Sequence, residues 1–277
     1  MGDKIMLKLK LRIVLCAMLL ISSNVIFAIE SPQTTTAESA QGASIEGETS
    51  SSFSVTPIRI EFNSPGKIVT LNVFNNSTAP LYAQANLLQY LQHNKGGLLL
   101  DDSAPLSEAP AVIVTPVILQ KVPGNKKQIM RILAIKQDPE KEYAYRLVIK
   151  SLAPTSLTKS AAAFSIGYSI PVFVLPANIH ETYKIDYLSV DNKHYLKVSN
   201  TGNVHIAFSS IAITLGDKNM KLKGSGARVF PGNYNIIEVP KNIAVQLHGQ
   251  PINLNITKST PSDWEKPITE SMTVSMS

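Results

Sequence analysis

The segment that decides the fold reads FSIGYSIPVFVLP, from Phe164 to Pro176. Large apolar residues alternate with serine and glycine in its first half; these are Phe164, Ile166, Tyr168 and Ile170. Successive side chains of an extended backbone point to opposite faces, so the apolar ones share a face. The pattern predicts a β-strand whose apolar ladder either closes the chain's own core or is lent to another protein that lacks a strand.

The sequence before this segment, from residue 53 onward, consists of short alternating or β-branched runs separated by Pro, Gly and Asn clusters. No long run has the apolar period of a helix, so the pattern is that of an all-β sandwich. Strands are predicted over residues 53–62, 68–75, 81–91, 112–115, 128–135, 143–152 and 163–175. Together they are enough for one immunoglobulin-like domain, which we expect to span residues 53–176.

A second set of strands follows a predicted domain boundary at Pro176–Asn178. These strands are predicted over residues 183–190, 194–200, 207–215, 227–230, 235–239 and 252–256. We expect a second β-sandwich domain over residues 177–257. Residues 258–277 show little periodicity and are predicted to be an irregular carboxyl-terminal tail.

The amino terminus has the features of a secretory signal peptide. Basic residues precede an apolar run from Ile13 to about Phe27, and the small residue Ala28 marks a plausible cleavage point. An uncleaved membrane anchor is less favoured, because the run is shorter than the roughly 20 residues that a bilayer needs. Removing residues 1–28 lowers the formal net charge from +6 to about +3 and removes the single cysteine, Cys16. We therefore expect an exported protein without disulfides.

Residues 29–52 are rich in Ser, Thr, Gln, Ala and Gly and contain almost nothing to bury, which predicts a disordered tail. The rest of the mature chain must fold by burying apolar surface alone, since it has no cysteine to cross-link. Its length is sufficient for that, so a small disulfide-stapled scaffold is excluded.

The residues give no sign of catalysis. The 5 histidines share no metal-ligand spacing, and we interpret Asp101-Asp102 as part of a solvated loop. A glycine-rich phosphate loop, a nucleophile elbow and a mature cysteine nucleophile are all missing from the sequence. Basic residues occur without the interleaved aromatics that stack bases. The sequence thus predicts a protein that is not an enzyme, with no cofactor, metal, small-molecule substrate or nucleic-acid partner.

Three basic residues of the first domain are embedded in predicted strands. Arg59 lies opposite the apolar face formed by Ile58, Ile60 and Phe62, and Arg146 and Lys150 lie opposite the apolar residues of the strand over 143–152. They are either ordinary outward-facing charges or parts of a clamp that grips a carboxylate through charge-assisted hydrogen bonds.

Ordered motifs through residues 53–176 resemble those of the PapD-like periplasmic pilus-assembly chaperones, and the resemblance continues more weakly to about residue 257. The motifs are Thr56-Pro-Ile-Arg59, Leu71-Asn-Val-Phe-Asn75, Pro80-Leu-Tyr-Ala-Gln-Ala85, Thr115-Pro116, Val122-Pro-Gly124, Glu142 ahead of Tyr145-Arg-Leu147, Ala153-Pro154, the strand ending at Pro176, Val198-Ser-Asn-Thr-Gly202 and Phe230-Pro-Gly232. Each motif is weak alone, whereas their order and spacing together are fairly specific.

This resemblance implies two immunoglobulin-like domains set at an angle, with a cleft between them, in a protein of the periplasm. Its implied partners are pilus or fimbrial subunits, completed by donor-strand complementation, and an outer-membrane usher that receives them. The implied donor strand is the ladder of Phe164, Ile166, Tyr168 and Ile170. The alternative is a secreted, non-enzymatic immunoglobulin-like binding or scaffold module that buries the same strand in its own core.

The resemblance also implies roles for charged residues. Arg59 falls on the family's first anchor for the subunit's carboxyl terminus, and Arg131 and Glu142 fall on a structural ion pair. Pro171 stands where the family usually has a second anchor, a lysine. Proline supplies neither a charge nor an N–H donor. Either Lys150 or Arg146 replaces that lysine, or Arg59 and backbone groups hold the carboxylate.

Overall fold

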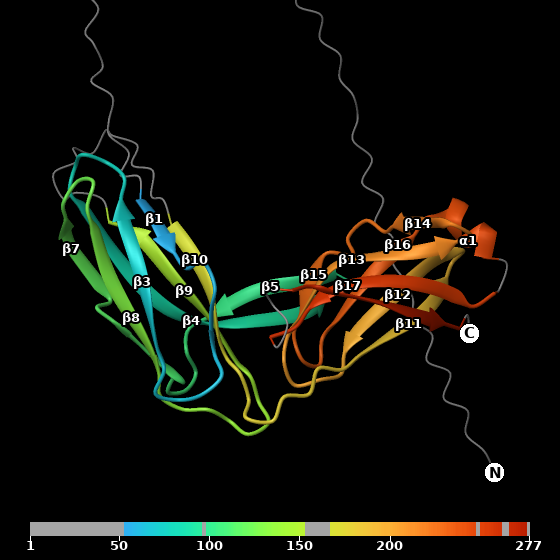
Figure 1. Cartoon of the computed structure of the whole chain (residues 1–277), viewed down its shortest axis with the longest axis horizontal. Helices are drawn as coiled ribbons and strands as arrows, with labels where there is room; N and C mark the ends of the chain where they lie inside the picture. Colours follow the sequence, from blue (N-terminus) through green and yellow to red (C-terminus); the bar gives the residue numbers. More distant parts are fainter. Residues whose placement is uncertain (1–52, 96–97, 153–166, 248–249, 262–265, 276–277) are drawn as a thin grey trace, which may run out of the picture. The chain divides into compact units, whose positions relative to one another are not determined.

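The computed structural model describes residues 53–95, 98–152, 167–247, 250–261 and 266–275. These residues form β-strands and one short helix, α1 (Lys241–Leu247), as Figure 1 shows. No helix in the described ranges is long and apolar enough to cross a bilayer. The all-β prediction is therefore confirmed, and the sheets fall into two immunoglobulin-like sandwiches.

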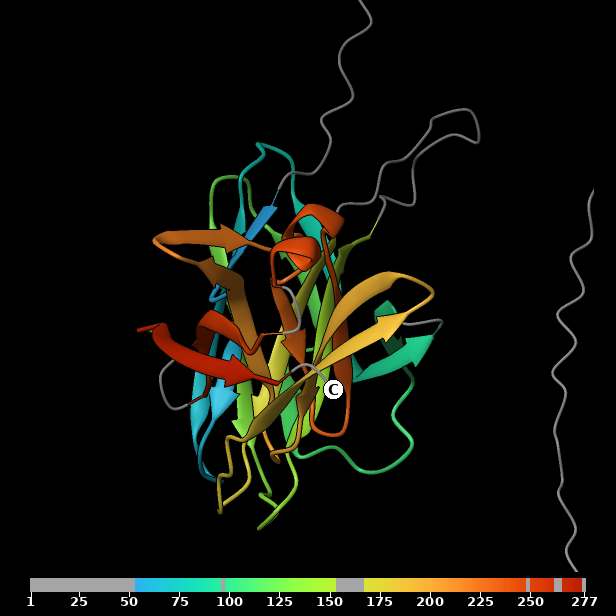
Figure 2. The ribbon, with the colours of Figure 1, turned by 90° about the vertical axis from the view of Figure 1, so that its right-hand side faces the viewer.

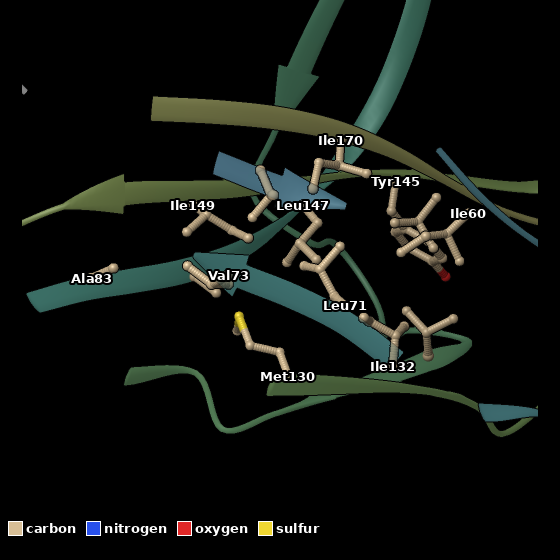
Figure 3. Close-up of a cluster of buried hydrophobic side chains, with 14 of the residues drawn as sticks. Ile60, Leu71, Val73, Ala83, Met130, Ile132, Tyr145, Leu147, Ile149 and Ile170 are labelled. Carbon is tan, nitrogen blue, oxygen red and sulfur yellow. The ribbon is translucent and has the colours of Figure 1, made fainter. Parts of the chain in front are cut away.

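The first sandwich consists of two sheets. One has the strand order β1 (Phe53–Thr56), β3 (Ile68–Asn75), β8 (Lys127–Ala134) and β6 (Val112–Thr115). The other has the order β2 (Ile60–Phe62), β10 (Gly167–Val174), β9 (Tyr143–Ser151), β4 (Leu81–Lys95) and β5 (Leu98–Ala104), and β7 (Ile118–Val122) also pairs with β4. Alternate residues of both sheets fill a common core, which includes Leu71, Met130, Leu147 and Ile170 (Figure 3).

The first predicted strand, over residues 53–62, is divided between the two sheets. β1 pairs antiparallel with β3, whereas β2 pairs parallel with β10. Pro57 lies at the break and has no N–H to continue a ladder. Ile58, predicted to share the buried face, is 71% exposed, whereas Ile60 is 2% exposed. The crossing places Arg59 immediately before β2.

Residues around Asp101 form a strand, so the prediction of a solvated loop there was wrong. β5 pairs with β4 from Gln89 to Lys95, and β4 extends past the predicted end at residue 91. The side chains of this hairpin reach the second sandwich. Gln92 Nε2 donates to the Arg228 carbonyl at 2.6 Å, and Asn94 Nδ2 donates to the Tyr234 carbonyl at 2.6 Å.

The second sandwich also has two sheets. Its first contains β11 (Tyr183–Val190), β12 (Lys193–Asn200) and β16 (Tyr234–Val239). Its second contains β14 (Lys218–Lys221), β13 (Ile206–Leu215), β17 (Ile252–Ser259) and β18 (Ile268–Val274), with β15 (Ala227–Val229) pairing with β13. A separate core, including Leu196, Ile213 and Ile256, lies between these sheets.

The carboxyl-terminal region differs from the irregular tail predicted for residues 258–277. β18 pairs with β17 from Ile252 to Lys258, so it completes a sheet (Figure 2). Its sequence, ITESMTV, is rich in polar and β-branched residues, and only Val274 is buried. An edge strand that buries little of its surface carries little hydrophobic alternation, which explains why the pattern was weak.

Candidate functional site

The most distinctive feature of the first sandwich is an unpaired edge on β10. β9 pairs with β10 along its whole described length, whereas β2 pairs only with Val172, Phe173 and Val174. Within the described ranges, no strand pairs with the other edge of residues 167–171. Such an edge presents backbone N–H and C=O groups to any incoming strand. This part of β10 can therefore accept a further strand.

The predicted apolar ladder is divided between different environments. Phe164 and Ile166 lie outside the described residues. Tyr168 is half-buried; its hydroxyl donates to the Phe53 carbonyl at 2.9 Å, and its ring meets the Phe53 ring edge-on at 5.1 Å. Ile170 is 1% exposed and belongs to the core of the first sandwich. The structure thus places the described half of the ladder in the chain's own core.

Arg59 takes part in a buried network that joins the two sandwiches. Its Nε donates to Glu61 Oε1 at 2.8 Å, its Nη2 contacts the same oxygen, and this Nη2 lies 2.7 Å from His205 Nε2. His205 Nδ1 lies 2.8 Å from Glu142 Oε2. The His205 side chain is fully buried and stacks on the Phe173 ring at 4.0 Å. The predicted anchor residue is therefore engaged by groups of the same chain.

Burial and charge act together on this network. Burial lowers the pKa of the Arg59 guanidinium, Glu61 opposes that effect, and the nearby Arg228 adds to the lowering. For Glu61, burial favours the neutral acid, but His205 and Arg59 outweigh it and lower the pKa of the carboxyl. For His205, burial opposes the charged form, but the carboxylates of Glu142 and Glu61 raise the pKa. These groups hold one another in place.

The structure does not bring Arg131 and Glu142 together as an ion pair. Arg131 is exposed on β8, in register with Thr70 and Thr115 of the same sheet. Glu142 instead accepts hydrogen bonds from the backbone and the ring of His205. The partner lies 63 residues along the chain, in the second sandwich. His205 lies in no recognised motif, so the sequence did not predict this pairing.

The other predicted cations lie on β9, on the outer face of its sheet. Arg146 is in register with Pro171. Its Nη2 contacts Asp101 Oδ2 at 3.2 Å, its Nη1 donates to Ser169 Oγ at 3.2 Å, and its Cζ lies 3.8 Å from the Tyr90 ring centroid. Lys150 is exposed, in register with Gly167, and forms no ion pair with another described residue. Only Arg146 therefore stands beside the uncharged position 171.

An aromatic cluster connects these cations. It contains Tyr90, Phe173 and Phe230, whose rings lie 4.6–6.3 Å apart. Burial and the hydrogen bond to Asp101 raise the pKa of Tyr90 to about 12, so its hydroxyl remains a donor. Tyr90, Phe173, His205 and Glu61 were not predicted from the sequence as site residues. Only Glu61 left a signal, as a charged residue between the buried Ile60 and Phe62.

A cavity of about 400 Å³ adjoins the network and is lined by residues including Tyr90, Glu142, Tyr143, Phe230 and Asn233. In the described part of the chain, no group of three or more His, Cys, Asp or Glu side chains is placed to hold a metal ion. The arrangement can pair with a strand at the β10 edge and attract an anion at the arginines.

Comparison with known proteins agrees with this geometry. Residues 52–180 match the family described as pili and flagellar-assembly chaperone, PapD N-terminal domain. No curated protein matches the sequence.

Solved structures share the fold. The class 5 fimbriae chaperone CfaA is 18% identical, with a TM-score of 0.58 over 82% of this chain and 100% of that chain. A chain in the complex of Salmonella enterica SafA pilin with the SafB chaperone is 16% identical, with a TM-score of 0.53 over 83% of this chain and 99% of that chain. The E. coli chaperone DraB is 17% identical, with a TM-score of 0.51, over 82% and 97% of the two chains.

The described residues thus form a pair of immunoglobulin-like sandwiches, the first of which has an open strand edge. Residues 52–180 therefore belong to the PapD N-terminal domain family of pili and flagellar-assembly chaperones.

Proposed function

We propose that this protein works in the periplasm, where it holds pilus or fimbrial subunits by donor-strand complementation and delivers them to an outer-membrane usher. The observation that supports this most directly is the β10 edge at residues 167–171, which lacks a strand neighbour among the described residues. A subunit that lacks one strand exposes backbone groups and an apolar groove. Pairing with β10 would provide hydrogen-bond partners for these backbone groups and side chains to fill the groove.

In this proposal Phe164 and Ile166 enter the subunit, whereas Tyr168 and Ile170 stay in the chaperone's core. Burying one large apolar side chain is worth roughly 1.5–3 kcal/mol before the cost of ordering the partners. The backbone ladder adds hydrogen bonds that depend little on the subunit's sequence. The division explains how one strand can bind a client while remaining attached to its own sandwich.

The subunit's terminal carboxylate would bind beside Arg59 and Arg146. Both guanidiniums are held in position by the chain's own acids, Glu61 and Asp101. A guanidinium carries five N–H donors, so an arginine that binds one carboxylate can donate to a second. Lys150, opposite Gly167, lies further along the strand and would contact the client's flank.

A second candidate is a secreted, non-enzymatic binding or scaffold module. The burial of Tyr168 and Ile170 in the chain's own core favours it, because a strand committed to its own domain is not available to a client.

One double substitution separates the two candidates. The protein is co-expressed with a pilus subunit that lacks one strand, and the recovery of the complex on a tagged subunit is measured for the wild type and for Phe164→Asp with Ile166→Asp. We expect loss of the complex with an unchanged unfolding midpoint. Ile170→Asp is the matched control and should unfold the first sandwich, because this side chain is 1% exposed.

Unchanged recovery of the complex in the double variant would remove donor-strand binding. Unfolding of the double variant would favour the scaffold module. Delivery is tested by adding the purified complex to membranes that contain the usher; the loaded chaperone should be retained, and the empty double variant should not.

A further inference from the structure

The outer face of the β10 sheet carries an aromatic platform, formed by Phe173 of β10 and Tyr90 of β4. Their ring centroids lie 6.3 Å apart, and Phe173 is fully buried. Phe230, from the second sandwich, meets both rings edge-on, at 4.6 Å from Tyr90 and 6.0 Å from Phe173. The platform is therefore built by both sandwiches.

Arginines from separate elements lie over this platform. The Arg59 Cζ lies 5.5 Å from the Phe173 centroid, and the Arg228 Cζ lies 5.4 Å from the same centroid. The Arg146 Cζ lies 3.8 Å from the Tyr90 centroid. Each distance is within the range of a cation–π contact, which positions a guanidinium while leaving its N–H donors directed around the ring.

The position of Arg228 is fixed through its backbone. Gln92 Nε2 donates to the Arg228 carbonyl at 2.6 Å, and Gln92 Oε1 accepts from the Phe230 N–H at 2.8 Å. This one amide side chain therefore holds the backbone on both sides of Val229, at the end of β15. Arg228 is thus presented to the first sandwich by the β4–β5 hairpin.

Charges of both signs gather here, since Glu61 and Glu142 favour the charged form of Arg59. Arg228 is close enough to Arg59 to disfavour its charged form, and Arg59 is only 12% exposed, so water screens the repulsion poorly. An anion placed among these guanidiniums relieves that repulsion. A carboxylate matches the fork of a guanidinium in shape as well as in charge.

We infer that Arg228 is a third carboxylate-binding residue, which joins Arg59 and Arg146 around the Phe173–Tyr90 platform to hold a client's terminal carboxylate. The inference rests on the proposed function. Arg146 supplies charge directly opposite Pro171, and Arg228 supplies it from the second sandwich. Client binding then involves both sandwiches, so all three arginines can bind the carboxylate only while the two sandwiches are in contact.

The test measures how much binding depends on the carboxylate. The probe is a fluorescent peptide of alternating valine and threonine that ends in a free carboxylate, compared with the same peptide ending in a carboxamide. Wild-type protein should bind the acid about tenfold more tightly than the amide, as expected for a charge-assisted hydrogen bond. Arg228→Gln should bring the two affinities to within about threefold of each other.

Further variants separate this role from a purely structural one. Arg228→Lys keeps the charge but loses the fork, and should give an intermediate ratio. Arg131→Gln removes an exposed arginine of the opposite sheet and should leave the ratio unchanged. A purely structural role of Arg228 would weaken both peptides equally in Arg228→Gln, and that result would overturn the inference.

The proposed function and the inference fail in different ways. If Phe164→Asp with Ile166→Asp weakens both peptides while Arg228→Gln leaves the acid-to-amide ratio at the wild-type value, strand addition stands and the role of Arg228 is refuted. If the double variant binds both peptides as the wild type does, strand addition at β10 is refuted.

Discussion

The two halves of β10 belong to one strand but have different neighbours. Val172, Phe173 and Val174 lie between β9 and β2, and all are fully buried. Residues 167–171 have β9 on one side and no described strand on the other. One half therefore stabilises the fold, while the edge of the other half is available to a partner. Except at the buried Ile170, substitutions in the two halves should affect stability and binding separately.

The largest effect is expected at Phe173. Phe173→Ala removes a fully buried ring that contacts His205, Tyr90 and Phe230. Such a cavity should lower the free energy of unfolding by about 3–5 kcal/mol, measured by urea denaturation. Phe74→Ala on β3, where the ring is 38% exposed, is the matched control and should cost about 1 kcal/mol or less. Similar losses in the two variants would contradict the assignment of a structural half.

An intermediate effect is expected for the pH dependence of stability. It arises from His205, whose ring stacks on Phe173. The pKa of His205 is raised above its ordinary 6.5 in the folded protein. The folded state therefore binds this proton more tightly than the unfolded chain does. Its stabilising contribution is fully present below pH 6.5 and is lost as the pH rises through the folded pKa.

The measurement is the free energy of unfolding of the wild type and of His205→Asn at several pH values. The slope above pH 6.5 should be present in the wild type and absent in the variant, and for one proton it is at most about 1.4 kcal/mol per pH unit. A flat wild-type profile would mean that His205 stays neutral and accepts a hydrogen bond from Arg59 Nη2.

The smallest effect is expected at the open end of β10. An added Cβ at Gly167 would lie 3.3 Å from Lys150 Cγ, in a side chain that can move. Gly167→Ala should therefore change the unfolding free energy by about 0.5 kcal/mol or less. Gly202→Ala is the contrasting variant, because its Cβ would lie 2.1 Å from the His180 carbonyl oxygen, and it should cost about 1–3 kcal/mol. A large loss at Gly167 would show that this end is also structural.

Predictions from the sequence succeeded where local pattern decides the structure. The alternation around Leu71, Leu147 and Ile213 placed β3, β9 and β13 within a residue or two. The predictions were wrong where contacts between residues far apart in the chain decide the structure. Glu142 pairs with His205 of the other sandwich, and the strand at Asp101 exists because it pairs with β4.

By itself, the sequence determined the all-β class, because alternation and turn residues act within a few positions of each other. It also placed Arg146 and Lys150 within a strand. Only the tertiary structure decided that β2 covers one half of the β10 edge and that Arg59 contacts His205. It also decided that Arg59 and Arg228 both lie over the Phe173 ring. These pairings join residues far apart in the chain, and their energies depend on burial and register, which appear only when the sheets have assembled.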